Sequence, residues 1–404
     1  MAACMTGPHA LSTFYRLCPG RARHIDGPTC SNASSRRMES QRSHPPTDQW
    51  QPIMPERTFA LRAVPGFYAS SPGIQIAAQI SDTATDADLQ FLQQLGVEWV
   101  MVGIADNANQ HVDHYKALVQ RVAAYDLAIY RISDQRVHNV PEITLNLPGR
   151  DEKVEDLCQF IRNIGAAGIH YHTYAHMGNG IWSSGRTQGR GGMDARRLDI
   201  NDATGRWDQA TYEGGGLTHG REYTEEELWA NYEYMIRRVA PVAEEAGVFV
   251  GIHPDDPPVY PLGGIPRCMF GNFAGYKQAM DIADSPNIGV CLCVGCWLEG
   301  GKQGMGGSVE EAIAYFGSRS KLFKIHFRNV SNPMPEPWSE TLMDDGYQDM
   351  HLVMRALREV EFDGAIIPDH IPALHGGHNA GVAYSIAYMR ALVQAVNNEH
   401  GGPK

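Results

Sequence analysis

The sequence lacks several features, and each absence argues against a class of protein. No apolar run approaches the roughly 20 residues that cross a bilayer, so we expect no transmembrane helix and no membrane partner. The formal net charge is −12 and the body of the chain has no basic stripe, which argues against nucleic acid as a partner. The eight cysteines show no disulfide framework, because three of them crowd into the run CLCVGC at 291–296. We therefore expect a reducing, cytoplasmic setting.

Residues 1–60 differ in composition from the rest of the chain. They lack sustained periodicity and are rich in Ser, Pro, Arg and His, with few acidic residues. Such a segment is typical of a disordered extension, of a start codon assigned too early, or of a transit peptide. We favour a disordered extension or an early start codon over a transit peptide for residues 1–60, so that 1–60 is a disordered or leader extension followed by one (β/α)₈ catalytic domain over 61–404.

From residue 73 onward, apolar runs typical of buried strands alternate with segments of helical periodicity. The runs occupy 73–80, 97–104, 128–133, 169–174, 248–253, 288–295, 321–330 and 364–370. The longest helical segment starts after Thr224, a good N-cap, and stops before Gly247, and another opens with a capping box at Ser308. Eight alternating pairs predict an α/β fold, a single (β/α)₈ TIM barrel. The rival is an open doubly wound sheet, which usually carries a glycine-rich fingerprint that GIQIAAQISDTATD lacks.

The connection after the fourth strand is long. Residues 178–222 hold many glycines and charges and no clear periodicity, so we predict a long loop there. It would lie at the carboxyl ends of the strands, where barrel active sites are built.

Each of the last four predicted strands ends on a side chain that can bind a metal. These side chains are His253, Cys293, His326 and Asp369. Because consecutive barrel strands are neighbours, the four groups should meet at the carboxyl rim. Imidazole, thiolate and carboxylate together suit a divalent ion such as Mn²⁺, Fe²⁺, Zn²⁺ or Co²⁺. A single strand-end histidine is more often a hydrogen-bonded core residue, so the repetition over four strands carries the prediction.

At these residues the sequence resembles the mannonate dehydratase family, a group of xylose-isomerase-like TIM barrels. The similar segments are HPDDPP (253–258), GGIPR (263–267), GVCLCVG, KIHFRNV and IIPDH, and Glu340 falls where the family has a glutamate. The resemblance is clear over about 248–395 and weaker back to 73. It implies a metal-dependent lyase, with Mn²⁺ or Fe²⁺ favoured over Zn²⁺ or Co²⁺, that dehydrates D-mannonate or a close analogue to 2-keto-3-deoxy-D-gluconate. The metal ligands that it implies are the same four residues.

The chain departs from the family pattern after IIPDH. The family has a tyrosine-containing segment there, thought to transfer a proton, whereas this chain reads IPALHGGHNAGVAYS. His375 and His378 are the candidate replacements, and we take His378 as a catalytic candidate. The long loop keeps only Trp182 and Arg186-Thr187 from the family's Trp-x-Arg-Thr.

Further candidates surround the predicted ion, and each has a structural alternative. Arg328 could clamp a carboxylate or form a rim salt bridge. His370 could transfer protons or cap the next helix. Asp255 could hold a ligand or shape a tight turn. For substrate binding we take Arg186, His172 and Glu340. A solvated loop charge is the favoured alternative for Arg186, and the face of the strand that His172 occupies is open. We expect Lys324 to be a paired structural charge inside the barrel.

Three functions are compatible with these residues. A sugar-acid dehydratase is favoured, a metal-dependent sugar isomerase or epimerase is second, and a binding protein that kept the ion but lost catalysis is third. The expected partner is a small sugar acid, and a homo-oligomer is compatible with the base rate among soluble enzymes.

Overall fold

A computed structural model describes residues 73–207 and 209–400 of the 404-residue chain, without the side chain of Asn107. The predicted extension over 1–60 lies outside these residues. Within them, no helix combines the length and the apolarity of a membrane span.

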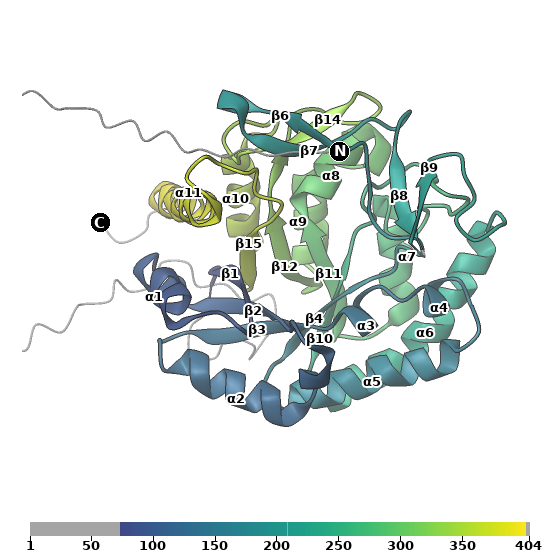
Figure 1. Ribbon diagram of the computed structural model, residues 1–404, viewed down its shortest axis with the longest axis horizontal. Coiled ribbons are helices and arrows are strands. Elements are labelled where there is room, and N and C mark those ends of the chain that lie inside the picture. Colours follow the sequence, from purple (N-terminus) through teal and green to yellow (C-terminus); the bar gives the residue numbers. More distant parts are fainter. Residues whose placement is uncertain (1–72, 208, 401–404) are drawn as a thin grey trace, which may run out of the picture. The chain divides into compact units, whose positions relative to one another are not determined.

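Eight parallel strands form a barrel, in the spatial order β3-β2-β1-β15-β12-β11-β10-β4 (Figure 1). A parallel bridge between Asn139 and Ala175 brings the two edges of the sheet together, so that the barrel nearly closes. The predicted (β/α)₈ fold is confirmed. The barrel strands are β1 (Gln75–Ser81), β2 (Trp99–Gly103), β3 (Ala128–Ser133), β4 (Tyr171–Ala175), β10 (Phe249–His253), β11 (Ile288–Cys293), β12 (Leu322–Phe327) and β15 (Ala365–Pro368).

The helices surround the barrel strands (Figure 1). Local sequence sets where several of them begin. Thr224 and Ser308 both form the predicted caps, as capping boxes with Glu227 and Glu311. The helices are α1 (Asp86–Gln94), α2 (Val112–Ala123), α3 (Gln135–His138), α4 (Pro141–Thr144), α5 (Arg150–Ala166), α6 (Glu225–Glu245), α7 (Phe273–Ala283), α8 (Val294–Met305), α9 (Val309–Gly317), α10 (Met350–Glu359) and α11 (His378–Glu399), with 3₁₀ turns at Asn107–Asn109 and Arg190–Gly192.

The predicted long connection after β4 contains five short strands, which form parts of two small antiparallel sheets. One sheet has the order β13-β14-β7-β6 and the other β5-β8-β9. Because β7 pairs with β14, which follows β12, the segment is fastened to the carboxyl side of the barrel. Its strands are β5 (Trp182–Ser183), β6 (Arg186–Gln188), β7 (Asp194–Leu198), β8 (Thr204–Trp207) and β9 (Ala210–Glu213), and the partners are β13 (Asn329–Val330) and β14 (Trp338–Thr341).

Two irregularities in strand register shape the barrel interior. Tyr130 on β3 and Phe323 on β12 are each an extra residue without a partner on the neighbouring strand. The hydroxyl of Tyr130 donates a 2.5 Å hydrogen bond to the main-chain oxygen of Phe323. An extra residue shifts the alternation of side chains along a strand, which brings the following residues, Arg131 and Lys324, to the interior as well.

Candidate active site

The four predicted metal ligands lie together at the carboxyl ends of their strands. Nε2 of His253 is 3.2 Å from Nδ1 of His326, which is 3.3 Å from Oδ2 of Asp369. The ligand atoms of Cys293, His326 and Asp369 lie within 4.8 Å of one another, and Cys293 also groups with His253 and Cys296 at that limit. Nε2 of His326 is buried and lacks a hydrogen-bond partner in the described part of the chain. A divalent ion would satisfy such an orphaned nitrogen, so the donor set fits a metal.

Cys293 has the environment of a thiolate. It is the N-cap of α8, and its sulfur accepts a 3.4 Å hydrogen bond from the main-chain N–H of Cys296. Burial alone would raise the pKa of Cys293, but the Cys296 thiol and the Arg328 charge outweigh it and hold the pKa well below its usual range. The thiolate is the form of cysteine that binds metals.

Arg328 is buried and contacts several anionic groups at once, so it does not form the exposed rim salt bridge considered as its alternative role. Its Nε lies 3.3 Å from the Cys293 sulfur, and its terminal nitrogens donate to Glu340 at 2.9 Å and to Glu299 at 2.6 Å. It is only 2% exposed, and Asp256 lies 3.4 Å away. Arg328 therefore neutralises and orients the anionic groups beside the ligand cluster, and its nitrogens are already engaged by protein carboxylates.

His370 points into the cluster and does not cap α11. Its Nδ1 is hydrogen-bonded to Glu340 at 2.8 Å, and its Nε2 lies 3.6 Å from Asp369. Burial lowers the pKa of His370, but the carboxylates of Asp369 and Glu340 outweigh it and raise the pKa to about 9. Its backbone φ is 49°, in the left-handed region that few non-glycine residues adopt. Its side chain is 30% exposed, whereas that of Glu340 is 2% exposed, so His370 is the more accessible member of the pair.

Arg196 is a member of this network that the sequence reasoning missed. From β7 it reaches Asp256 with both terminal nitrogens, and it donates to Glu340 at 3.3 Å and to the main-chain oxygen of Trp182 at 2.9 Å. One of its nitrogens also lies 3.3 Å from Nδ1 of His370. Its signal was the alternation in DARRLD, which becomes informative only once these residues are known to form a strand.

Two predicted substrate-binding residues lie elsewhere. His172 is fully buried, and its ring packs 4.9 Å from that of Phe160 in α5, because it occupies the face of β4 opposite to Thr173, whose hydroxyl points to Cys291. Arg186 is exposed and ion-paired with Asp194 on the neighbouring strand, so its structural alternative as a solvated loop charge holds.

The structure places the two remaining catalytic candidates outside the network around Arg328. Asp255 is paired with Arg267 at 3.4 Å, and it is the next residue, Asp256, that reaches the network. Burial raises the pKa of Asp255 to about 6. His378 is the exposed first residue of α11 and lines a hollow with residues of β1 and α1, such as Ser81 and Asp88, and none of the cluster residues lines that hollow.

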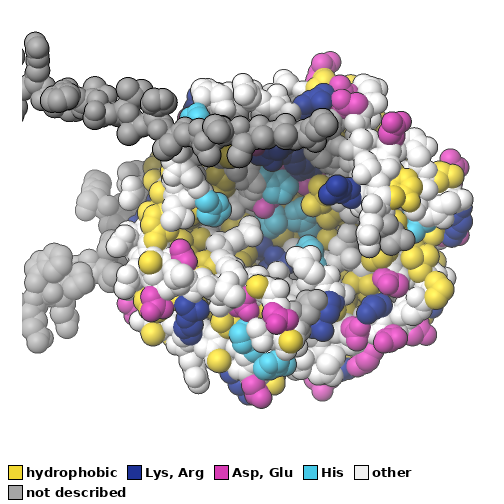
Figure 2. All heavy atoms as spheres, viewed as in Figure 1, with side chains coloured by type: hydrophobic (Ala, Val, Ile, Leu, Met, Phe, Trp, Pro, Cys, Tyr) yellow, Lys and Arg dark blue, Asp and Glu magenta, His cyan; other side chains and the backbone are white. Residues whose placement is uncertain are grey.

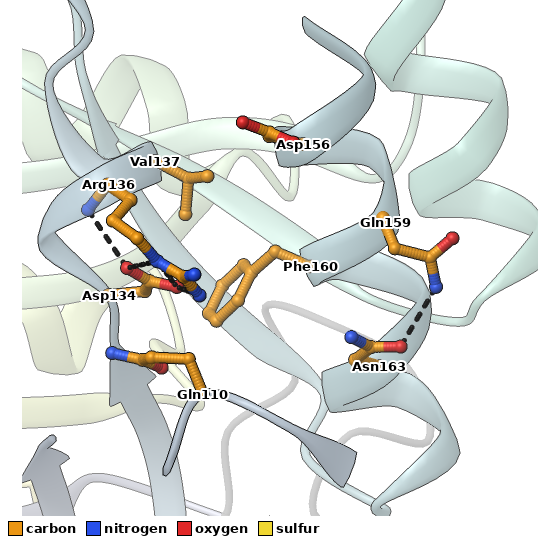
Figure 3. A pocket seen from close by; sticks show the side chains of 8 residues that line it. All are labelled: Gln110, Asp134, Arg136, Val137, Asp156, Gln159, Phe160 and Asn163. Carbon is orange, nitrogen blue, oxygen red and sulfur yellow. Dashed lines mark hydrogen bonds and ion pairs between the residues drawn. The ribbon is translucent and has the colours of Figure 1, made fainter. Parts of the chain in front are cut away.

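One face of the barrel is hollowed. In Figure 2, histidine and basic side chains are visible deep in the centre of this face. A separate pocket of about 220 Å³ lies between α3, α5 and the turn before α2 (Figure 3). Its buried carboxylate, Asp134, accepts hydrogen bonds from Arg136, and Gln159 pairs with Asn163, so these polar groups are already partnered. The ligand cluster is the stronger candidate for chemistry.

Comparisons with known proteins found relatives that cover most of the chain. The family model for D-mannonate dehydratase (UxuA) matches residues 81–401. A mannonate dehydratase from Streptococcus pneumoniae (strain 70585) is 31% identical over 296 residues, which are 68% of this chain and 78% of the relative. The crystal structure of mannonate dehydratase from Streptococcus suis serotype 2 superposes with a TM-score of 0.72 at 24% identity, covering 83% of this chain and 96% of that one. An L-ribulose 3-epimerase shares the fold at a TM-score of 0.52 and 13% identity, covering 81% of this chain and 97% of the epimerase.

Fold and site together define a (β/α)₈-barrel enzyme with a cluster of metal-competent side chains at the carboxyl ends of its strands. Within that class, the chain belongs to the D-mannonate dehydratase family, and it is a hydro-lyase of the sugar-acid dehydratase type. The resemblance expected from the sequence is confirmed.

Proposed function

We propose that the chain dehydrates D-mannonate, or a sugar acid of closely similar structure, to the 2-keto-3-deoxy acid in a metal-dependent reaction. The observation that carries the proposal is the meeting of His253, Cys293, His326 and Asp369 at one point of the rim. The names of the relatives support the substrate class. A cytoplasmic location is in keeping with the free state of the described cysteines, which are Cys158, Cys268, Cys291, Cys293 and Cys296.

The same four residues would hold the metal. When bound there, a divalent ion supplies a Lewis acid that stabilises negative charge developing next to the substrate carboxylate. We favour Mn²⁺ or Fe²⁺ over Zn²⁺ or Co²⁺. The position of Arg328 against the Cys293 sulfur keeps that sulfur ionised and fixed in direction, which is the task of an outer residue at a metal site.

His370 is the proposed proton-transfer residue. The reaction removes a proton from the carbon next to the carboxylate and releases a hydroxyl from the following carbon as water, so a group must hold a proton near the leaving oxygen. His370 extends from the end of β15, is more exposed than the acids behind it, and is held through Nδ1 by Glu340. This arrangement leaves Nε2 as the proton-carrying atom and gives Glu340 the role of fixing the ring.

An isomerase or epimerase is the second candidate, and the shared fold with an L-ribulose 3-epimerase favours it. The two reactions are distinguished by their products. A dehydratase loses one water and gives a product 18 mass units lighter than the substrate, whereas an isomerase or epimerase gives a product of unchanged mass.

The test is metal analysis combined with product analysis of the full chain. We expect about one equivalent of metal in the wild type and a loss of metal in His326→Ala, measured by elemental analysis. With Mn²⁺ and D-mannonate we expect the 2-keto-3-deoxy acid. Metal without this product would reject D-mannonate and direct the assay to other sugar acids and to isomerisation. A lack of metal in both proteins after reconstitution would reject the four-ligand site. Sedimentation of the same sample tests the predicted homo-oligomer.

A further inference from the structure

Lys324 is a buried side chain whose amine has no hydrogen-bond partner in the described part of the chain. Its side chain is fully buried, and its Nζ makes no hydrogen bond to any described residue. The sequence predicts a paired structural charge here, but no described residue accepts a hydrogen bond from this amine. Cys291 and Asp369 act on Lys324 electrostatically, but neither hydrogen-bonds its amine. A buried ammonium group without a hydrogen-bond partner is costly, and a bound anion would relieve that cost.

A second cation lies in the same interior. Arg131 on β3 is partly exposed, its Nε is buried without a partner among the described residues, and one terminal nitrogen lies 3.4 Å from Nδ1 of His138. Burial and the charges of Arg131 and Lys324 together lower the pKa of His138 to about 3. Both cations are therefore within electrostatic reach of the same imidazole.

The backbone places Lys324 just beneath the ligand cluster. Lys324 is the register partner of Cys291, and His326 is the register partner of Cys293, two residues further along both strands. Two residues of a strand span about 6–7 Å. Arg131 and Lys324 each follow an extra residue in their strand, and such bulges are enriched next to active sites, where they re-aim side chains. Two separate bulges thus direct a basic side chain into the barrel interior.

We propose that Arg131 and Lys324 form an anion-binding floor under the ligand cluster, and that it binds the carboxylate of the sugar-acid substrate. This inference rests on the proposed function. Arg131, the partly exposed member, meets the carboxylate first, and the four-carbon side chain of Lys324 supplies the second charge from behind. The pair distinguishes an acid from a neutral sugar of the same length. The positive charges of Arg131 and Lys324 repel each other in a low-dielectric interior, and a carboxylate relieves that repulsion whereas a neutral group does not.

The test compares an acid with its neutral counterpart. Binding of D-gluconate and of D-glucitol, which carries CH₂OH in place of the carboxylate, is measured by calorimetry on the metal-loaded full chain. The proteins are the wild type, Lys324→Met, Arg131→Met and Lys302→Met. Lys302 is a matched control, since it is 70% exposed and pairs only with Glu311 on the surface.

We expect Lys324→Met and Arg131→Met to weaken gluconate binding by about 10- to 100-fold, the range for one charge-assisted hydrogen bond, and to leave glucitol binding unchanged. Lys302→Met should match the wild type with both ligands. Lys324→Met should also melt at a higher temperature than the wild type without ligand, because an unpaired buried charge has been removed.

Two outcomes would overturn the proposal. Equal losses for gluconate and glucitol would make Lys324 a structural residue. Unchanged gluconate binding in Lys324→Met, together with a loss of stability that Cys291→Ser reproduces, would make it the counter-charge of the Cys291 thiolate instead. If the wild type turns over no sugar acid, the proposed function fails, but the comparison of gluconate with glucitol still decides whether this floor binds a carboxylate.

Discussion

Replacement of Arg196 by methionine tests whether the segment after β4 completes the active site. The change keeps an unbranched apolar side chain about as long as the aliphatic part of arginine and removes the guanidinium charge. It leaves Asp256, which is 1% exposed, with only the 3.4 Å contact to Arg328, and it deprives Glu340 of one of its two arginines. Loss of one partner from a buried ion pair costs about 3–5 kcal/mol. We expect Arg196→Met to lose about that much unfolding free energy at neutral pH.

Arg186→Met is the matched control. Arg186 is the direct cross-strand partner of Arg196, in the same hairpin, but its side chain is 56% exposed and pairs with Asp194 at the surface. A surface pair contributes less than about 1 kcal/mol. Denaturant unfolding of both variants and of Arg196→Lys measures the contrast, with the lysine variant intermediate because it keeps the charge but loses the fork that reaches Asp256 with two nitrogens.

The effect of Arg196→Met should also depend on pH. Burial raises the pKa of Asp256, but Arg196 and Arg328 outweigh it and lower the pKa to about 2, below the ordinary value of 3.8. A carboxylate with a depressed pKa contributes stability above its unfolded pKa and loses it as the pH falls toward the folded value. The difference between the wild type and Arg196→Met should therefore shrink between pH 4 and pH 2. Equal losses in Arg196→Met and Arg186→Met at pH 7, or a difference that does not change with pH, would refute the reasoning.

Three further predictions concern other parts of the barrel. Gly295→Ala should destabilise the protein by about 1–3 kcal/mol and reduce turnover, because its Cβ would collide with the Arg328 guanidinium; Gly215→Ala, which has open space, is the unfolding and activity control. His172→Leu should leave the KM for the sugar acid unchanged and keep or raise the melting temperature, because His172 packs among apolar groups away from the site. A rise in KM would show that His172 contributes to substrate binding. Burial lowers the pKa of His176 to about 3. As the pH falls below 6.5, the unfolded chain therefore binds a proton at His176 before the folded chain does, and the unfolding free energy falls by about 1.4 kcal/mol per pH unit. In His176→Phe the slope of unfolding free energy against pH should be flatter by that amount, and an unchanged slope would contradict the assignment.

The barrel and the ligand cluster could be predicted because both depend on local regularities. Each strand is a short apolar run, and each ligand closes its strand, so parallel alignment alone brings the four groups to one rim. For the same reason Cys293 and His326 are register partners. These positions follow from strand order and direction, without knowledge of any loop.

The surrounding shell could not be predicted, because tertiary pairing decides it. Arg196 and Arg186 are both arginines in the same segment, and only the pairing of β7 with β14 sends the first into the site and leaves the second in solvent. The choice between Asp255 and Asp256 depends on which of two adjacent side chains faces the cluster, which the sequence leaves open in HPDDPP. The sequence of the fourth strand also leaves open whether His172 faces the barrel interior or the surrounding helices.

The distribution of charge explains why this shell is so closely connected. Asp256, Glu299 and Glu340 are buried beside Cys293 and Asp369, and two arginines, Arg196 and Arg328, lie among them. Five anionic groups would exceed two permanent cations, so charge balance at the rim requires protonation of some groups, a further cation, or both. A divalent ion at the ligand cluster would supply the missing positive charge. Arg131 and Lys324 of the proposed anion-binding floor lie beneath the cluster and do not belong to it. The rim thus favours a metal and the floor favours an anion, and a metal-binding sugar acid with a single carboxylate is the ligand that suits both.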